Sequence, residues 1–373
     1  MNRRSDSRLT AGFAGKLTQA ALFRAAFPLA FSVCCACSRA QQPPAQAQSP
    51  STPPPPSASS ISREVKDVFA HAAKAVVKVH GVDEHSDIYG TGFFIDPTGT
   101  LYTSYSVGGE AGNFTIDFSG KQYPARQILA DVRSGIAMLK IDAVTPALPI
   151  GKTEQLEVAT PVITIGYPLD LPETPSFGMI AGFDRKYLGR YFSTTHLRVN
   201  LPVQRGEAGA PLLNLNGEVV GILMNSLENN SGCHALPIEA AEKIRSDFVR
   251  FGEPRHGWVG ANVGEASNVV EGSRAEVTEV LDTPATDAGI QRGDILLQVG
   301  KTKVHEPEDV LDASFFITAG DTVPITVIRG NEKLTFRVQA DLHPGSRRPA
   351  MSATLNQNQA LPLSLQAEPK GNP

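Results

Sequence analysis

Short apolar segments separated by glycine, proline and aspartate dominate the middle of the chain. Apolar residues recur with helical spacing near residues 65–73, and beyond this point they alternate with polar residues or form short runs. Such segments, bounded by turn residues, predict β-strands. The expected strands cover residues 75–82, 92–96, 100–104, 114–118 and 136–141, and then 161–167, 177–183, 197–203, 212–215 and 218–224. This spacing indicates a mainly β fold, although composition alone fits a barrel and a sandwich equally.

The N-terminal residues 1–37 have the features of an export leader. Basic residues precede the apolar segment 25–33, and a cysteine cluster ends at Cys37. This order is typical of a secretory signal peptide, and the apolar segment is too short for a membrane span. An apolar run ending in Ala-Cys also resembles a bacterial lipoprotein signal, which makes Cys37 the candidate lipidation site. Soluble release and lipid anchoring both stay open.

The remainder of the chain divides by composition. Residues 38–61 are rich in proline, alanine, glutamine and serine, which predicts an extended linker. One domain is expected over residues 62–248, ending in a helix, and a second over residues 256–342. Residues 343–373 predict a disordered tail. The sequence thus indicates an exported protein of the bacterial envelope or periplasm that meets a membrane only through its leader or a lipid anchor.

Composition narrows the function classes. The length of 373 residues and the hydrophobic fraction of 41% suit two or three packed domains. The net charge of −4 includes the basic leader, so the rest of the chain is more acidic and lacks a nucleic-acid footprint. After the leader Cys233 is the only cysteine, which leaves no internal disulfide. No cluster of side chains has metal-ligand spacing, and neither a metal nor another cofactor is expected.

The segment from residue 203 to residue 212 carries the strongest functional motif. It reads Val-Gln-Arg-Gly-Glu-Ala-Gly-Ala-Pro-Leu and leads into two apolar segments joined by an Asn-Gly turn. This order resembles the active-site loop of the HtrA/DegP family of trypsin-like proteases, in which the loop reads Gly-Asn-Ser-Gly-Gly-Pro. The resemblance implies a trypsin-like double β-barrel followed by one PDZ domain, with the active site in the cleft between the barrels.

A serine protease requires a hydroxyl nucleophile, an imidazole base and a carboxylate that orients the imidazole. The resemblance places Ala208 at the nucleophile position, Ser106 at the histidine position and Gly135 at the aspartate position. The loss of all three groups predicts a non-catalytic protein. The backbone amides of Gly206 and Ala208 occupy the oxyanion-hole positions of the family, and these donors need no side chain.

The second domain resembles the PDZ domain of HtrA proteins. PDZ domains add a peptide as a strand to a sheet edge and receive its terminal carboxylate on backbone amides. The loop Val259, Gly260 and Ala261 fits the carboxylate-binding position, and Gly260 would allow close backbone approach. The opposite wall of the groove is expected around Val310, Leu311 and Phe315.

These observations favour a non-catalytic HtrA-like protein that binds peptide segments or C-termini of exported proteins through its PDZ domain, as an adaptor, chaperone-like binder or regulator. One alternative is a serine-type endopeptidase with an atypical, displaced active site. Another is a structural lipoprotein. An active HtrA-type protease is a further candidate partner, and the family resemblance implies a homo- or hetero-oligomer, with a trimer as its typical form.

Overall fold

The computed structural model describes residues 58–82, 87–109, 111–188, 190–281 and 284–346. The leader, Cys37 and most of the predicted linker and tail lie outside these residues. The chain divides into two units, Met1–Pro55 and Pro56–Pro373, and every described residue belongs to the second. Helix α1 (Ala58–Ala72) begins inside the predicted linker, and its predicted apolar stripe buries Val68 in the core.

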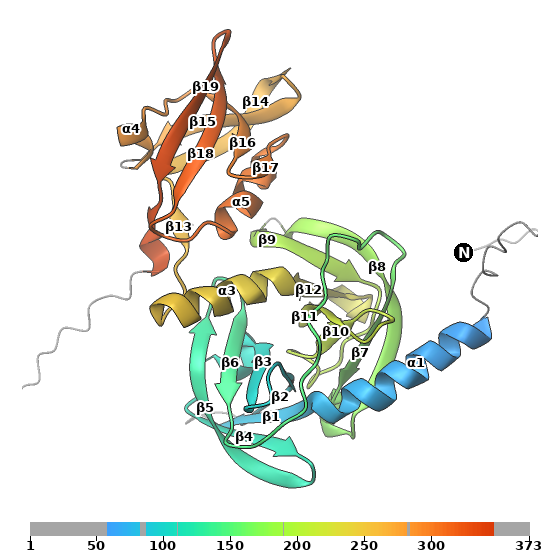
Figure 1. Ribbon diagram of the computed structural model, residues 1–373. Helices are drawn as coiled ribbons and strands as arrows, with labels where there is room; N and C mark the ends of the chain where they lie inside the picture. The colour runs from blue at the N-terminus through green and yellow to red at the C-terminus, as the bar shows by residue number, and fades with distance from the viewer. Residues whose placement is uncertain (1–57, 83–86, 110, 189, 282–283, 347–373) are drawn as a thin grey trace, which may run out of the picture. The chain divides into compact units, whose positions relative to one another are not determined.

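The first barrel is a closed antiparallel sheet with the order β1-β2-β3-β6-β5-β4 (Figure 1). Its strands are β1 (Val76–Val82), β2 (Asp87–Phe94), β3 (Thr100–Ser104), β4 (Asn113–Phe118), β5 (Lys121–Asp131) and β6 (Ile136–Lys140). The 3-10 turn η1 (Ala73–Ala75) precedes it, and the short helix α2 (Tyr105–Gly108) follows β3. Alternate side chains point inward, and those of Val79, Leu101 and Ile116 are fully buried.

The second barrel is also closed, with the order β10-β11-β12-β9-β8-β7. Its strands are β7 (Pro161–Gly166), β8 (Thr174–Tyr187), β9 (Arg190–Val199), β10 (Pro211–Leu213), β11 (Val219–Ser226) and β12 (Cys233–Pro237), and 3-10 turns lie at η2 (Pro168–Asp170) and η3 (Glu228–Asn230). The mainly β class and the double barrel that the sequence predicted are therefore confirmed.

Helix α3 (Ile238–Phe251) packs on residues of both barrels. Its Ala241 and Ile244 share one buried cluster with Tyr102 of the first barrel and Ile163 of the second. The Tyr102 hydroxyl donates to Glu242 of the same helix at 2.7 Å. Gly252 ends α3 in the left-handed conformation, with φ of 77°, where glycine carries no steric penalty. This shared cluster fixes the two barrels against each other.

The PDZ-like domain contains a sheet with the order β14-β15-β16-β18-β19, and β17 pairs with β16. Its elements are β14 (Ala261–Val270), β15 (Ser273–Val280), α4 (Ala285–Ala288), β16 (Ile295–Val299), β17 (Thr302–Lys303), α5 (Pro307–Phe315), β18 (Thr322–Arg329) and β19 (Glu332–Gln339). A separate pair joins β13 (Gly257–Trp258) to β20 (Asp341–Leu342), and the turn η4 (Pro344–Ser346) follows. Strand β14 lies at the sheet edge.

A capping box starts helix α5. Glu306 and Asp309 each accept from the backbone amide of the other, and Pro307 occupies the first turn. The groove-forming helix therefore has a defined beginning. Among the described residues, no helix has the length and apolar character needed to cross a bilayer.

Candidate functional site

Left-handed glycines shape the loop between β9 and β10. Gly206 has φ of 99° and Gly209 has φ of 87°. A Cβ atom at Gly206 would lie 2.3 Å from the Tyr167 carbonyl oxygen, and one at Gly209 would lie 2.3 Å from the Thr91 carbonyl oxygen. Both contacts are with backbone, which cannot move aside cheaply. This loop conformation is therefore available only to glycine at both positions.

Thr91 of β2 holds the loop from the first barrel. Its amide donates to the Ala208 carbonyl at 3.0 Å, and its hydroxyl donates to the Gly206 carbonyl at 2.7 Å. The Tyr167 amide donates to the same hydroxyl at 3.1 Å. Sequence reasoning missed this function of Thr91. The two barrels thus fix the loop jointly.

The amides of Gly206 and Ala208 have no hydrogen-bond acceptor within the described residues. The Arg205 carbonyl accepts from the Leu169 amide at 2.7 Å, and the Glu207 carbonyl accepts from the Ala210 amide at 3.0 Å. In a trans peptide the N–H points away from the C=O, so both free N–H groups point away from these internal contacts. Gly206 and Ala208, with one residue between them, therefore offer two unpaired backbone N–H groups. An oxyanion site requires such donors.

Glu207 and Cys233 lie buried near this loop. One Glu207 carboxylate oxygen accepts from the Gln204 amide at 2.7 Å, and burial raises the pKa of Glu207 above its ordinary value despite that bond. Burial, with the charge of Glu207, raises the pKa of the Cys233 thiol to about 12. The thiol is therefore protonated at neutral pH and does not serve as a nucleophile.

The three positions assigned by resemblance hold no conventional triad group. Ser106 is exposed on α2, and its hydroxyl lies 2.9 Å from that of the buried Ser104. Gly135 has φ of 80°, and the terminal methyl of Met224 lies 2.4 Å from where its Cβ would stand. Ala208 packs against the core of the first barrel. Met224 therefore occupies space that a side chain at Gly135 would need.

Three buried histidines make their hydrogen bonds elsewhere. Nε2 of His234 lies 3.0 Å from the Asp184 carboxylate, and Nδ1 of His196 lies 2.8 Å from a backbone carbonyl. Burial lowers the pKa of His196 to about 4. Nε2 of His256 lies 3.0 and 3.1 Å from the two carboxylate oxygens of Asp131. In the described part of the chain, none of these three rings is hydrogen-bonded to a hydroxyl or thiol.

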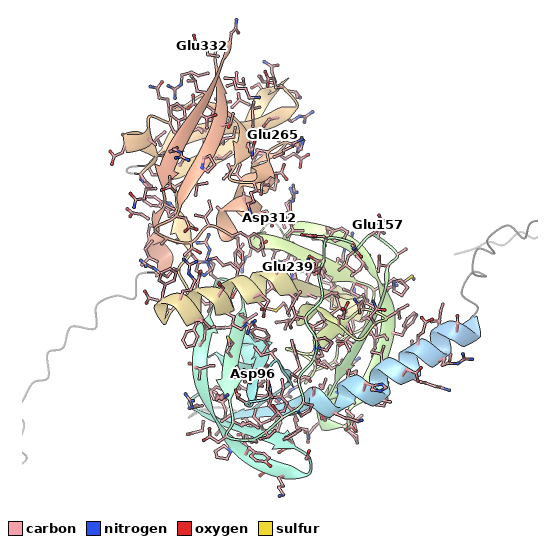
Figure 2. All side chains as sticks on the ribbon, viewed as in Figure 1. Asp96, Glu157, Glu239, Glu265, Asp312 and Glu332 are labelled. Carbon is pink, nitrogen blue, oxygen red and sulfur yellow. The ribbon has the colours of Figure 1, made fainter. Side chains whose placement is uncertain are left out.

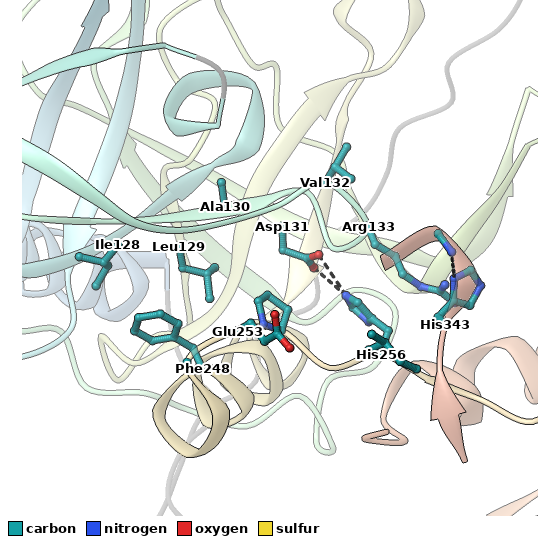
Figure 3. A pocket seen from close by; sticks show the side chains of 14 residues that line it. Ile128, Leu129, Ala130, Asp131, Val132, Arg133, Phe248, Glu253, His256 and His343 are labelled. Atoms are coloured by element: carbon teal, nitrogen blue, oxygen red, sulfur yellow. Dashed lines mark hydrogen bonds and ion pairs between the residues drawn. The ribbon is translucent and has the colours of Figure 1, made fainter. Parts of the chain in front are cut away.

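The Asp131–His256 pair joins two segments that are distant in sequence (Figure 3). Asp131 ends β5 and also accepts from the Ser134 amide at 3.0 Å, whereas His256 precedes β13. Burial raises the pKa of Asp131, but the hydrogen bond and charge of His256 and the Ser134 donors lower it below 3.8 overall. The pair lines a pocket of about 730 Å³ together with Arg133 and His343. Sequence reasoning missed this pairing.

The described chain continues past residue 342, where a disordered tail was predicted. The His343 amide donates to the His256 carbonyl at 2.9 Å, which holds this residue in place. Burial and the nearby charges of Arg133 and His256 lower the pKa of His343 to about 4.

A groove of about 610 Å³ lies between β14 and α5 of the PDZ-like domain. Val259 and Ala261 line one wall, and Val310 and Leu311 line the other. Of the remaining predicted residues, Gly260 adopts φ of 78° beside the groove without lining it.

The sixth predicted groove residue, Phe315, requires a correction. It is fully buried and lies outside the groove lining. As the last residue of α5 it packs on His256, with ring centroids 5.6 Å apart, and under the Lys243 ammonium. Phe315 therefore anchors the helix end and does not form the wall.

Two family models match the chain. The trypsin-like peptidase domain matches residues 90–222, and the PDZ domain matches residues 257–340. Both matches agree with the architecture described above.

Curated relatives carry protease names. The chain is 26% identical to a probable periplasmic serine endoprotease DegP-like of Bartonella henselae, over 69% of this chain and 54% of the relative. It is 26% identical to the serine endoprotease DegS of Salmonella typhimurium, over 74% and 85%. It is 30% identical to the serine protease HTRA1 of Xenopus tropicalis, over 67% and 59%. The chain spans little more than half the length of the DegP-like protein and 59% of HTRA1.

Solved structures share the fold. The HtrA-type protease AlgW with tripeptide matches with a TM-score of 0.67 and 20% identity, over 75% of this chain and 97% of that chain. The serine endoprotease from Yersinia pestis matches with a TM-score of 0.58 and 26% identity, over 75% and 98%.

These relatives contradict the prediction of a non-catalytic protein, since they are named serine endoproteases. That prediction depended only on the side chains at Ser106, Gly135 and Ala208, and it gave little weight to the backbone donors of the loop. The comparisons favour the alternative interpretation, an endopeptidase with an atypical site. From its domain order and its relatives, the chain belongs to the HtrA family of proteins that join a trypsin-like domain to a PDZ domain.

Proposed function

We propose that this protein is a serine-type endopeptidase with an atypical active site, and that it selects polypeptides through its PDZ groove. The observation that carries the proposal is the pair of unpaired amides at Gly206 and Ala208, on a loop that both barrels hold. Such donors stabilise the oxyanion that forms when an amide or ester carbonyl is attacked. The protease names of the relatives support the same activity.

In this proposal the attacking group is the exposed hydroxyl of Ser106, which is hydrogen-bonded to Ser104. The Ser106 oxygen adds to the substrate carbonyl carbon while water takes its proton, because neither hydroxyl has an imidazole or carboxylate partner in the described residues. The leaving alcohol or amine departs with a proton from water, and a second water molecule hydrolyses the acyl-enzyme and restores the hydroxyl. Without a positioned base, the rate enhancement is expected to be on the order of 10³–10⁴ over water, supplied by oxyanion stabilisation and substrate binding. The enzyme is therefore slow, and an activated ester is the appropriate first substrate.

Ser106→Ala is expected to lower turnover of a peptidyl p-nitrophenyl ester to the rate that the oxyanion donors and substrate binding support without a nucleophile, because it removes the attacking hydroxyl. The experiment compares steady-state nitrophenol release by the purified protein, Ser106→Ala and the control Ser119→Ala, whose serine lies on an exposed turn. Equal release by all three proteins would exclude Ser106 as the nucleophile. Release by the unmodified protein no faster than in buffer would contradict the endopeptidase proposal itself.

The PDZ-like groove is proposed to bind extended peptides. β14 is an edge strand with free backbone groups, and apolar side chains of β14 and α5 face each other across the groove. The candidate ligands are peptide segments or C-termini of exported proteins. Assembly into homo-oligomers, or with an active HtrA-type protease, is part of the same proposal, and light scattering of the purified protein tests the homo-oligomer.

We infer a location in the bacterial periplasm or envelope, supported by the names of the periplasmic relatives. Lipid attachment at Cys37 is the more specific proposal. Cys37→Ser is expected to abolish incorporation of radiolabelled palmitate and to move the protein from the membrane to the soluble envelope fraction. Cys34→Ser serves as the matched control. Palmitate incorporation that persists in Cys37→Ser would contradict this assignment.

A further inference from the structure

The two ends of the PDZ groove carry opposite charges that have no partner. One end is lined by Trp258 and Val259, and the C-terminal end of α5 lies there because Phe315 packs on His256. The other end is lined by Glu265 of β14 and by residues at the start of α5. An extended peptide in the groove would therefore meet a different charge at each of its ends.

Arg133 supplies the positive charge. It belongs to the turn after β5 in the trypsin-like domain and lines the pocket beside Asp131 (Figure 3). It also lines the PDZ groove. Burial lowers the pKa of Arg133 below its ordinary value although the charge of Asp131 opposes this shift, and its Nε atom is buried without a hydrogen-bond partner. No carboxylate lies within 4.0 Å of its side-chain nitrogens among the described residues. A half-buried guanidinium with free donors is a receptor for a carboxylate.

Glu308 supplies the negative charge at the opposite end. Its acidic neighbours are compensated, since Glu265 lies 3.3 Å from Arg274 and Glu306 lies 3.9 Å from Arg185. Glu308 forms no ion pair in the part of the chain that the structure describes, although it is half-buried and lines the groove. Because Glu308 lies in the first turn of α5, its negative charge also stabilises the helix. Its contribution to peptide affinity is therefore measured separately from its contribution to helix stability.

We propose, building on the proposed function, that Arg133 and Glu308 are specificity-determining residues of the groove, and that together they select peptides with a free C-terminal carboxylate and a basic residue upstream. The backbone of such a peptide pairs with β14, and its apolar last side chain enters the space between Ala261 and Leu311. Alternate residues of a strand face the same side, so the third residue from the end points towards α5 as well. A lysine there approaches Glu308 while Arg133 receives the carboxylate.

The proposal is tested by fluorescence polarisation with a labelled peptide that ends in Lys-Ala-Lys-Ala-Val. Matched probes carry a C-terminal amide or glutamate in place of both lysines. Arg133→Gln is expected to weaken binding of the first peptide about tenfold or more, and to leave binding of the amide unchanged, because a charge-assisted hydrogen bond is lost. Glu308→Gln is expected to weaken the lysine peptide about two- to fivefold relative to the glutamate peptide.

Control variants are available in the same two domains. Arg126→Gln removes an exposed arginine of β5, the strand that precedes the turn with Arg133, and Glu332→Gln removes the exposed first residue of β19, labelled in Figure 2. Neither residue lines the groove, so neither variant should alter any affinity. Unchanged amide binding by Arg133→Gln also reports that its groove is folded.

The outcomes separate this inference from the proposed function. Equal loss of carboxylate and amide binding in Arg133→Gln, or no loss of either, would overturn the role of Arg133 while peptide capture stands. Equal affinity of the lysine and glutamate probes would overturn the role of Glu308. If the unmodified protein binds none of the probes, peptide capture by the groove fails and the inference fails with it.

Discussion

Gly206→Ala is expected to lower kcat/KM for peptidyl ester hydrolysis by about 10²-fold, the loss typical of one missing oxyanion donor. The reason is steric. A Cβ atom would meet the Tyr167 carbonyl oxygen at 2.3 Å, and a left-handed φ of 99° disfavours alanine. The loop must shift, and the Gly206 amide shifts with it. Initial rates of nitrophenol release over a range of ester concentrations give the measurement.

Gly217→Ala is the matched control. Gly217 also has positive φ, 78°, but its Cβ would meet only the Val68 methyls, at 4.0 Å. Both variants therefore place alanine at a positive φ, and only Gly206→Ala displaces the Gly206 amide. Equal rates for the two variants would show that the Gly206 amide makes no contribution to the reaction.

Asp131→Ala is expected to destabilise the protein by about 3–5 kcal/mol, because it leaves the buried His256 without its partner. For a domain of this size, the corresponding fall in Tm is roughly 10 °C. The Ser134 amide loses its acceptor as well. Thermal unfolding followed by circular dichroism measures the effect. Asp142→Ala, at an exposed position, is the control and should change Tm by no more than a degree or two.

The same carboxylate predicts a pH dependence. The pKa of Asp131 is lower in the folded protein than its ordinary value of 3.8, so the ionised form favours folding. Its contribution is complete above that ordinary value and is lost as the pH falls through the lower, folded pKa. The stability difference between the unmodified protein and Asp131→Ala should therefore shrink as the solution is acidified below about pH 4. A difference that grows on acidification would show that the carboxylate is not held in its ionised form.

The sequence predicts most of the strands because their apolar residues are continuous or alternate regularly. Strand β5 escapes prediction for a physical reason. Most of its first residues are exposed, and it contains Pro124, so little apolar alternation marks it. The first turns of helix α1 escape prediction because small and polar residues dominate them and leave no apolar stripe. For β5, pairing with β4 and β6 decides the conformation and local propensity does not.

The candidate site is predicted in part. The loop around Gly206 and the groove residues Val259 and Leu311 follow from local motifs, since each motif lies within one short segment. The Asp131–His256 pair spans 125 residues, and no local pattern connects its members. The place of Arg133 at the PDZ groove is likewise a product of tertiary packing. Side-chain positions matched by resemblance also misled the functional prediction, because they do not report what the backbone can bind.

Cleavage of reduced, unfolded β-casein in water enriched with oxygen-18 tests the central claim most directly. Hydrolysis by this protein places the heavy isotope in newly formed C-termini, which mass spectrometry detects, and parallel preparations of Gly206→Ala control for contaminating proteases. The account predicts slow, reproducible cleavage sites that are lost or strongly reduced in Gly206→Ala. Absence of labelled C-termini from the unmodified protein, or equal cleavage by both preparations, would contradict it.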